Sequence, residues 1–260
     1  MSAMVLSVSA LAKSFDGVDA VRDVSFTVAT GEVVAMIGRN GAGKTTCFNV
    51  IHGELAADRG DVRFDGHPLL GLATHLIAHR GIGRTFQVPA TFASMTVRES
   101  IALALAAHDD RDRSLAAGML QPRSARADAL LVHLRIDDLA DAHCAALAYG
   151  DAKRLELALA LAGAPRLLLM DEPTAGMTAR SRRDLMQFVR DTARRDALAV
   201  LFTEHDMDIV FGFADRIIVL DRGSIIATGT PAEIRTNAAV QAAYLGVDER
   251  PPLGIHDIAR

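Results

Sequence analysis

Apolar residues occur in two patterns along the chain, and the two patterns predict two kinds of β-strand. In residues 24–28 and 62–64, apolar side chains alternate with polar or charged ones, which predicts strands with one face in solvent. Residues 167–170 and 197–202 are continuous apolar runs, as is typical of parallel strands that are buried on both faces. The chain is therefore expected to combine a half-exposed sheet with a buried one.

Helical patterns occupy the middle and the second half of the chain. In residues 179–195, apolar residues fall on one face of the expected helix and a series of arginines on the other. This pattern predicts an amphipathic helix whose arginines are solvated. The apolar face consists of Leu185, Phe188, Val189 and Thr192. Thr96 and Glu99 form a capping-box pattern before an apolar run. The polar stretch 108–125 predicts a surface loop or a weak helix, and the helix after it is expected to end near Arg135.

These elements predict one α/β domain with an insertion. The domain is expected to span residues 1–248, with a helical subdomain inserted at about residues 88–160. Two apolar runs, 217–220 and 225–227, flank Asp-Arg-Gly-Ser and predict a β-hairpin. Residues 249–260 contain two prolines and little periodicity, so we expect a mobile tail. The sequence contains no internal repeat.

Composition excludes several classes of function. The net charge of −4 provides no general attraction to nucleic acid. No apolar run approaches the length of a membrane span, and the first residues lack the pattern of a secretory signal. Two cysteines, Cys47 and Cys144, do not make a disulfide framework, so we expect reduced thiols in the cytoplasm.

The most informative motif is a glycine-rich loop at residues 38–45, which fits the phosphate-binding pattern G-x-x-x-x-G-K-[ST]. An apolar run at 33–37 precedes it and a helix is expected from Thr45 onward, which is the context that the motif requires. Glycines let backbone N–H groups converge on phosphate oxygens, Lys44 can reach the β- and γ-phosphates, and the Thr45 hydroxyl can ligate Mg²⁺. The predicted phosphate-binding residues are Gly38, Arg39, Asn40, Gly41, Ala42, Gly43, Lys44, Thr45 and Thr46.

A second motif narrows the range of reactions that a phosphate-binding loop can serve. The apolar run 167–170 ends in two carboxylates, Asp171 and Glu172. At the carboxyl edge of a parallel sheet these would lie beside the phosphates, where Asp171 can hold Mg²⁺. Glu172 would lie near the γ-phosphate, placed to polarise an attacking water.

At this point the chain resembles the ATP-binding cassette (ABC) ATPases over nearly its whole length. Phe15 lies where that family has an aromatic that stacks on adenine, and Gln87 lies where it has a glutamine that contacts Mg²⁺ or the attacking water. His205 matches the family's histidine that contacts the γ-phosphate. The family signature corresponds to Leu147, Ala148, Tyr149, Gly150 and Asp151. The resemblance implies a P-loop NTPase fold of the ABC type, with a mixed core sheet, a small antiparallel β-subdomain and an inserted α-helical subdomain.

Several segments also resemble the ATPase subunits of branched-chain amino acid importers. They are 81–87, 147–150 with 154–156, 204–207, 229–234 and 243–246. This resemblance implies an ATP- and Mg²⁺-dependent ATPase at the inner face of the cell membrane, driving uptake of hydrophobic amino acids or related amides. The implied partners are transmembrane permease subunits, a second ABC ATPase in a homo- or heterodimer, and indirectly a solute-binding protein. In such a dimer, each phosphate loop faces the signature of the other chain.

Three positions depart from the family pattern. Ala148 replaces a serine that is common in the signature, and Arg39 stands where proline is common. Thr178 replaces the usual aspartate or asparagine of the loop after Glu172. These departures put the cross-dimer contacts of the signature and of that loop in question.

Further functions remain open from the sequence. A small-molecule kinase or a GTPase is disfavoured by the signature and by His205. The same motifs are compatible with a nucleotide-gated interaction module that has little turnover, with an exporter ATPase and with a lipid-transport ATPase. Phe92 and Met95, which follow Gln87, either form a docking groove for a membrane subunit or fill the core of the helical lobe.

Overall fold

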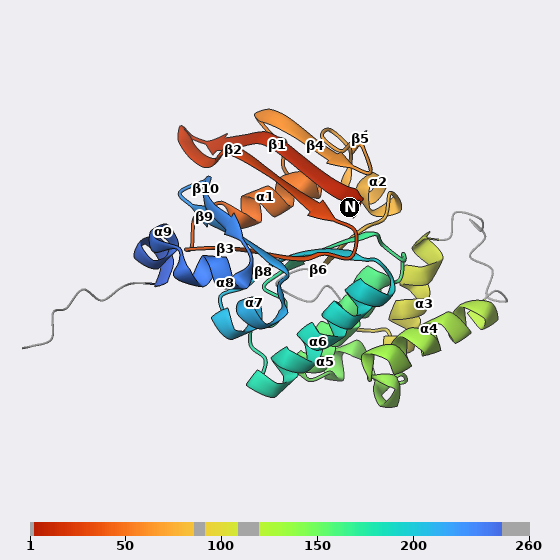
Figure 1. Cartoon of the computed structure of the whole chain (residues 1–260). Helices are drawn as coiled ribbons and strands as arrows, with labels where there is room; N and C mark the ends of the chain where they lie inside the picture. Colours follow the sequence, from red (N-terminus) through yellow and green to blue (C-terminus); the bar gives the residue numbers. More distant parts are fainter. Residues whose placement is uncertain (1–2, 86–91, 109–119, 246–260) are drawn as a thin grey trace, which may run out of the picture.

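The computed structural model describes residues 3–85, 92–108 and 120–245 (Figure 1). The strands are β1 (Met4–Phe15), β2 (Val18–Ala29), β3 (Val33–Gly38), β4 (Arg59–Phe64), β5 (His67–Pro68), β6 (Ile82–Thr85), β7 (Leu167–Asp171), β8 (Ala199–Thr203), β9 (Arg216–Asp221) and β10 (Ser224–Gly229). The α-helices are α1 (Lys44–Ile51), α2 (Thr74–His79), α3 (Val97–His108), α4 (Leu120–Leu134), α5 (Tyr149–Leu161), α6 (Ala179–Arg195), α7 (Met207–Phe213), α8 (Pro231–Thr236) and α9 (Ala238–Val240). Short 3-10 turns cover Asp137–Leu139 and Cys144–Ala146, and a π-helical turn covers Gln241–Leu245.

The centre of the fold is a six-stranded sheet in the order β10-β9-β3-β8-β7-β6. Its strands are parallel except at β10, which pairs antiparallel with β9. β3, β7 and β8 are buried at every residue, because their continuous apolar sequences suit a sheet that is covered on both faces. The buried parallel strands and the C-terminal hairpin that the sequence predicts are thus confirmed.

Two apolar clusters cover the two faces of this sheet. Alternate residues of the four central strands belong to different clusters: along β3, Val33, Ala35 and Ile37 belong to one cluster, and Val34 and Met36 to the other. The second cluster also contains α1 and the inner face of a four-stranded antiparallel sheet, β2-β1-β4-β5. Figure 1 shows this antiparallel sheet above α1, with α5, α6 and α7 on the opposite side of the central sheet.

The described chain between β6 and β7 is mainly helical. Its helices α3, α4 and α5 contribute apolar side chains to the same cluster as one face of the central sheet. The capping box expected before α3 is present: Oγ1 of Thr96 accepts from the Glu99 amide (3.2 Å), and the Thr96 amide donates to Glu99 Oε2 (2.8 Å). The stretch 108–125, expected to be a loop or a weak helix, already contains the start of α4 at Leu120. The boundaries of the helical subdomain remain a prediction, and residues 249–260 lie outside the described part.

Two details of the sequence analysis need correction. The strand expected at 197–202 begins at Ala199, because Ala197 has a left-handed φ of 55° and belongs to the turn after α6. The arginine face of α6 is only partly solvated. Arg182 and Arg190 are half-buried and donate to the backbone carbonyls of Met177 (2.8 Å) and Gly212 (3.0 Å). Arg182 reaches the loop before α6 and Arg190 reaches α7, instead of extending into water.

A partly buried ion pair joins the two sheets. Arg216, at the start of β9, donates through Nε and Nη2 to both carboxylate oxygens of Glu32 (2.7 and 3.0 Å), and through Nη2 to the Thr27 carbonyl of β2 (2.6 Å). Glu32 Oε2 also accepts from the Ala29 amide (2.8 Å). A bidentate guanidinium–carboxylate contact of this kind fixes orientation as well as distance.

We predict that Arg216→Ala lowers the free energy of unfolding by about 1–3 kcal/mol, because a partly buried carboxylate loses its charged partner. Urea denaturation measures this change. Arg194→Ala is the matched control: Arg194 is exposed and lies 3.9 Å from Asp215, so its removal should cost less than about 0.5 kcal/mol. Equal losses in the two variants would contradict the assigned role of Arg216.

Candidate active site

The glycine-rich loop joins β3 to α1, as expected from the sequence. Gly43 caps the N-terminus of α1 with a φ of 102°, a conformation that side-chain-bearing residues rarely adopt. A Cβ at Gly43 would lie 2.3 Å from the carbonyl oxygen of Ala20, and one at Gly38 would lie 2.4 Å from that of Leu220. The loop therefore runs against backbone on two sides, and the glycines at both ends are needed for its path.

Lys44 folds back across this loop. Its Nζ donates to the carbonyl oxygens of Gly38 (2.7 Å) and Arg39 (3.3 Å), and the residue is only 7% exposed. Burial lowers the pKa of Lys44, and the nearby carboxylates of Glu172 and Asp171 partly oppose that shift. The ammonium group is thus held between the loop and the two carboxylates, where a phosphate would offer it a charged acceptor in place of neutral carbonyls.

A cavity of about 460 Å³ lies over the loop. The residues that line it are Phe15, Ala20, Asn40, Gly41, Ala42, Gly43, Lys44, Thr45, Thr46 and Glu172. Phe15 ends β1 of the antiparallel sheet, and its exposed ring lies 5.4 Å from Lys13 Nζ. An exposed aromatic ring beside a phosphate loop has the geometry to stack on a nucleotide base. Arg39 lines a different cavity, together with Asp221, Arg222 and Ala242.

The two carboxylates lie at the carboxyl edge of the central sheet. Asp171 ends β7, is buried, and pairs in register with Thr203 at the end of β8. The Thr203 hydroxyl donates to Asp171 Oδ1 (2.6 Å) and accepts from the Glu172 amide (3.0 Å). Glu172 has a left-handed φ of 50°, which is uncommon for a residue with a side chain and frequent at functional sites.

His205 contacts Glu172 directly. Its Nε2 lies 2.8 Å from Glu172 Oε1, at hydrogen-bond distance. The preceding residue, Glu204, is buried, and its Oε1 accepts from both the amide (2.8 Å) and the hydroxyl (2.6 Å) of Thr174. The structure therefore brings His205 to the carboxylate that the sequence assigned to water activation.

The residues present suit a magnesium–nucleotide complex better than an all-protein metal site. Within the described residues, no group of three or more His, Cys, Asp and Glu side chains could hold a metal ion. The Thr45 hydroxyl, exposed on the first turn of α1, and the Asp171 carboxylate offer oxygen donors near the loop. Mg²⁺ is commonly bound by one or two such groups together with substrate phosphates. The donor set therefore fits Mg²⁺ that is held jointly with phosphate.

The signature segment, residues 147–151, lies apart from the cavity. Ala148 is the N-cap residue of α5 and makes no side-chain cap. Tyr149 is exposed and packs on the loop after Glu172: a Cβ at Gly176 would lie 3.0 Å from its ring. Ala148, Tyr149, Gly150 and Asp151 are thus not brought to the phosphate loop of their own chain. Gln87 lies outside the described residues.

Sequence reasoning missed two residues of the site. Ala20 lines the cavity from β2, and nothing in its local sequence signals that position. Thr203 bridges the two carboxylates. Its signal was a single polar residue that ends an apolar run directly before Glu204 and His205.

Comparison with known proteins identifies the family. Residues 21–175 match the family model described as ABC transporter. The chain belongs to the ABC transporter family and is an ATPase. Residues 224–250 match a second model, described as branched-chain amino acid ATP-binding cassette transporter.

Relatives match this ATPase over almost its whole length. The high-affinity branched-chain amino acid transport ATP-binding proteins BraF of Pseudomonas aeruginosa and LivG of Escherichia coli are each 37% identical to it over 255 residues, which cover 95% of this chain and 99% of theirs. The lipopolysaccharide export system ATP-binding protein LptB of Haemophilus influenzae is 36% identical over 93% of this chain and 97% of its own. The crystal structure of the ADP conformation of MJ1267, an ATP-binding cassette of an ABC transporter, is similar with a TM-score of 0.82 and 30% identity, covering 94% of this chain and 99% of that one. The expected ABC-ATPase fold is thereby confirmed.

We predict that Thr203→Val slows ATP hydrolysis about tenfold or more, because the hydroxyl orients both Asp171 and the Glu172 backbone. Steady-state ATPase assays measure the rate, and calorimetry should find ATP affinity little changed. Thr192→Val is the matched control. Its hydroxyl is buried without a hydrogen-bond partner in the described structure, so its removal should leave turnover unchanged and stability equal or higher. Normal hydrolysis by Thr203→Val would contradict the bridging role.

Proposed function

We propose that this ATPase powers an importer of branched-chain amino acids or related amides, from the inner face of the cell membrane. The observation that carries the solute class is the match of residues 224–250 to the branched-chain model, and the likeness to BraF and LivG supports it. The likeness to LptB, at 36% identity, makes a lipopolysaccharide exporter the second candidate. Within the described residues, no helix is long and apolar enough to cross a membrane. The proposal includes permease subunits as partners.

The geometry of the cavity supports the catalytic roles that we propose for most of these residues, and the resemblance to the family supports that of Gln87. The glycine loop, residues 38–45, cradles the phosphates, with Lys44 on the β- and γ-phosphates and Phe15 on the adenine. Glu172 polarises the attacking water, and His205, 2.8 Å from Glu172, contacts the γ-phosphate. Thr45, Asp171 and Gln87 are the proposed Mg²⁺ ligands, and the cation would neutralise developing phosphate charge. The helical subdomain at 88–160 carries the signature to a second nucleotide.

The signature segment supports a dimeric site. Ala148 to Asp151 lie away from their own chain's cavity, and Tyr149 is exposed at the start of α5. A second ABC ATPase, identical or related, would place its signature against this phosphate loop. Because Ala148 lacks a hydroxyl, the backbone of Gly150 and the N-terminus of α5 would bind the γ-phosphate across the interface.

The exposed ring of Phe92 supports contact with a membrane subunit. Phe92 is 58% exposed, whereas Met95 is half-buried and its carbonyl accepts from the Cys144 amide (3.0 Å). The exposure of Phe92 therefore favours the docking groove, whereas the partial burial of Met95 favours the core of the helical lobe. We propose that permease subunits dock here, with a solute-binding protein acting on the outer side.

We predict that Glu172→Gln retains ATP binding, nearly abolishes turnover and traps an ATP-bound dimer, because the amide keeps the size of the side chain but cannot polarise water. ATPase assays and size-exclusion chromatography with ATP test the three parts. Near-normal hydrolysis would reject the role of Glu172. Hydrolysis absent from the wild type, alone and with its permeases, would favour a nucleotide-gated module.

We predict that Phe92→Ser lowers leucine uptake by reconstituted vesicles about tenfold or more, while ATP hydrolysis by the isolated subunit stays within about twofold. Val132→Ser is the matched control, since Val132 is also apolar and exposed but lies on α4, and it should preserve uptake. Full uptake by Phe92→Ser would reject the docking site. Competition by other amino acids, amides and lipopolysaccharide in the same vesicles tests the solute class.

A further inference from the structure

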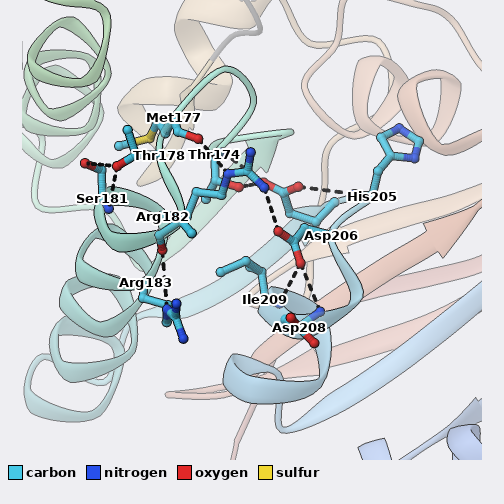
Figure 2. Close-up of polar contacts among 12 residues, drawn as sticks. Thr174, Met177, Thr178, Ser181, Arg182, Arg183, His205, Asp206, Asp208 and Ile209 are labelled. Atoms are coloured by element: carbon cyan, nitrogen blue, oxygen red, sulfur yellow. Dashed lines mark hydrogen bonds and ion pairs between the residues drawn. The ribbon is translucent and has the colours of Figure 1, made fainter.

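A single arginine of α6 connects the two loops that carry Glu172 and His205. We call residues 172–178 the Glu172 loop and residues 204–206 the His205 loop. Arg182 Nε donates to the Met177 carbonyl at the end of the first loop (2.8 Å), and its Nη1 donates to Asp206 Oδ2 at the end of the second (2.7 Å). Figure 2 shows the guanidinium between Met177 and Asp206.

Asp206 is itself fixed by the helix that follows it. As the N-cap of α7, its Oδ1 accepts from the amides of Asp208 (3.0 Å) and Ile209 (3.4 Å), while Oδ2 is left for Arg182. Burial opposes the charge on Asp206, but the hydrogen bonds from Arg182 and the two amides outweigh it and lower the pKa of the carboxyl. The carboxylate can therefore hold both contacts at once.

The two loops also meet at their other ends. Buried Glu204 accepts from the amide and hydroxyl of Thr174 through Oε1, and its Oε2 accepts from the His205 amide (3.1 Å). His205 thus lies between two connections, one through Glu204 and one through Arg182. With both in place, the segment that contains His205 cannot shift without moving the Glu172 loop.

The neighbouring arginine offers a direct comparison. Arg183 is exposed, points away along α6 in Figure 2, and donates to the Ala179 carbonyl of its own helix (3.4 Å). The two side chains are identical in chemistry and adjacent in sequence. Of the two, Arg182 is the one that reaches the site loops.

We propose that Arg182 is a positioning residue for ATP hydrolysis, which holds His205 and the Glu172 loop in one fixed relative position. This inference rests on the proposed function of Glu172 and His205. The departure at Thr178 keeps the helix cap beside this contact. That residue caps α6 by accepting from the Ser181 amide (3.3 Å), while Arg182 holds the adjacent carbonyl of Met177 in place.

The test compares Arg182→Gln with Arg183→Gln in the full chain. Arg182→Gln should lower kcat about fivefold or more, with the calorimetric affinity for ATP unchanged, because no cavity-lining residue is altered. Arg183→Gln should keep kcat within about twofold of the wild type. Equal turnover by the two variants, or a loss of ATP affinity that matches the loss of rate, would overturn the proposal.

A double-mutant cycle separates positioning from general stability. Asp206→Asn keeps an N-cap acceptor for α7 but loses the charge that pairs with Arg182. If the two groups act as one connection, the double variant should have the kcat of the slower single variant. Multiplicative losses would overturn the proposal, as would a fall in melting temperature large enough to unfold Arg182→Gln at the assay temperature.

The outcomes also distinguish this inference from the proposed function. A wild type that does not hydrolyse ATP, or a Glu172→Gln variant that does so normally, removes the catalytic assignment itself. If the wild type hydrolyses ATP, Glu172→Gln does not, and the Arg182 and Arg183 variants have equal rates, only the role of Arg182 is rejected.

Discussion

The phosphate loop, the two carboxylates and His205 all depend on the shared register of three parallel strands. β3 ends at Gly38, β7 at Asp171 and β8 at Thr203, and in the ladder Thr203 lies opposite both Met36 and Asp171. Each strand is buried on both faces, so a slip of one residue would move every side chain to the wrong apolar cluster. Core packing thus fixes the relative heights of the phosphate loop, the carboxylates and the His205 loop at one edge of the sheet.

At that edge, Glu172 adopts a backbone conformation that a residue with a side chain does not favour. Glu172 adopts a left-handed φ, at a cost of about 1–2 kcal/mol for a residue with a Cβ. Its amide donates to both the carbonyl (3.2 Å) and the hydroxyl (3.0 Å) of Thr203, and neutral hydrogen bonds of this kind contribute about 1 kcal/mol each. These bonds offset the strain and turn the carboxylate out of the strand direction, toward the cavity and His205. The same hydroxyl fixes Asp171, so one threonine orients both acids.

Local patterns in the sequence predicted most of the central fold, because strand burial, helix periodicity and capping depend on residues that are close in sequence. The β3–loop–α1 unit, the strand before Asp171 and the helix 179–195 could all be predicted in that way. Contacts between distant segments could not: Ala20 reaches the cavity only because the antiparallel sheet packs over α1. Nor could the sequence separate Arg182 from Arg183, since their different roles depend on which way each side chain leaves the helix.

The loop after Glu172 is where the two halves of the proposed site meet within one chain. Gly176 has a φ of 73°, and a Cβ there would lie 3.0 Å from the ring of Tyr149 in the signature segment, so both backbone conformation and packing favour glycine. At its start the loop carries Glu172, and at its end Arg182 joins it to Asp206. α5, which begins at Tyr149, and β7, which ends directly before Glu172, contribute to one apolar cluster. The groups proposed to act on one nucleotide and the segment proposed to act on the partner's nucleotide are thus separated by a single packed loop.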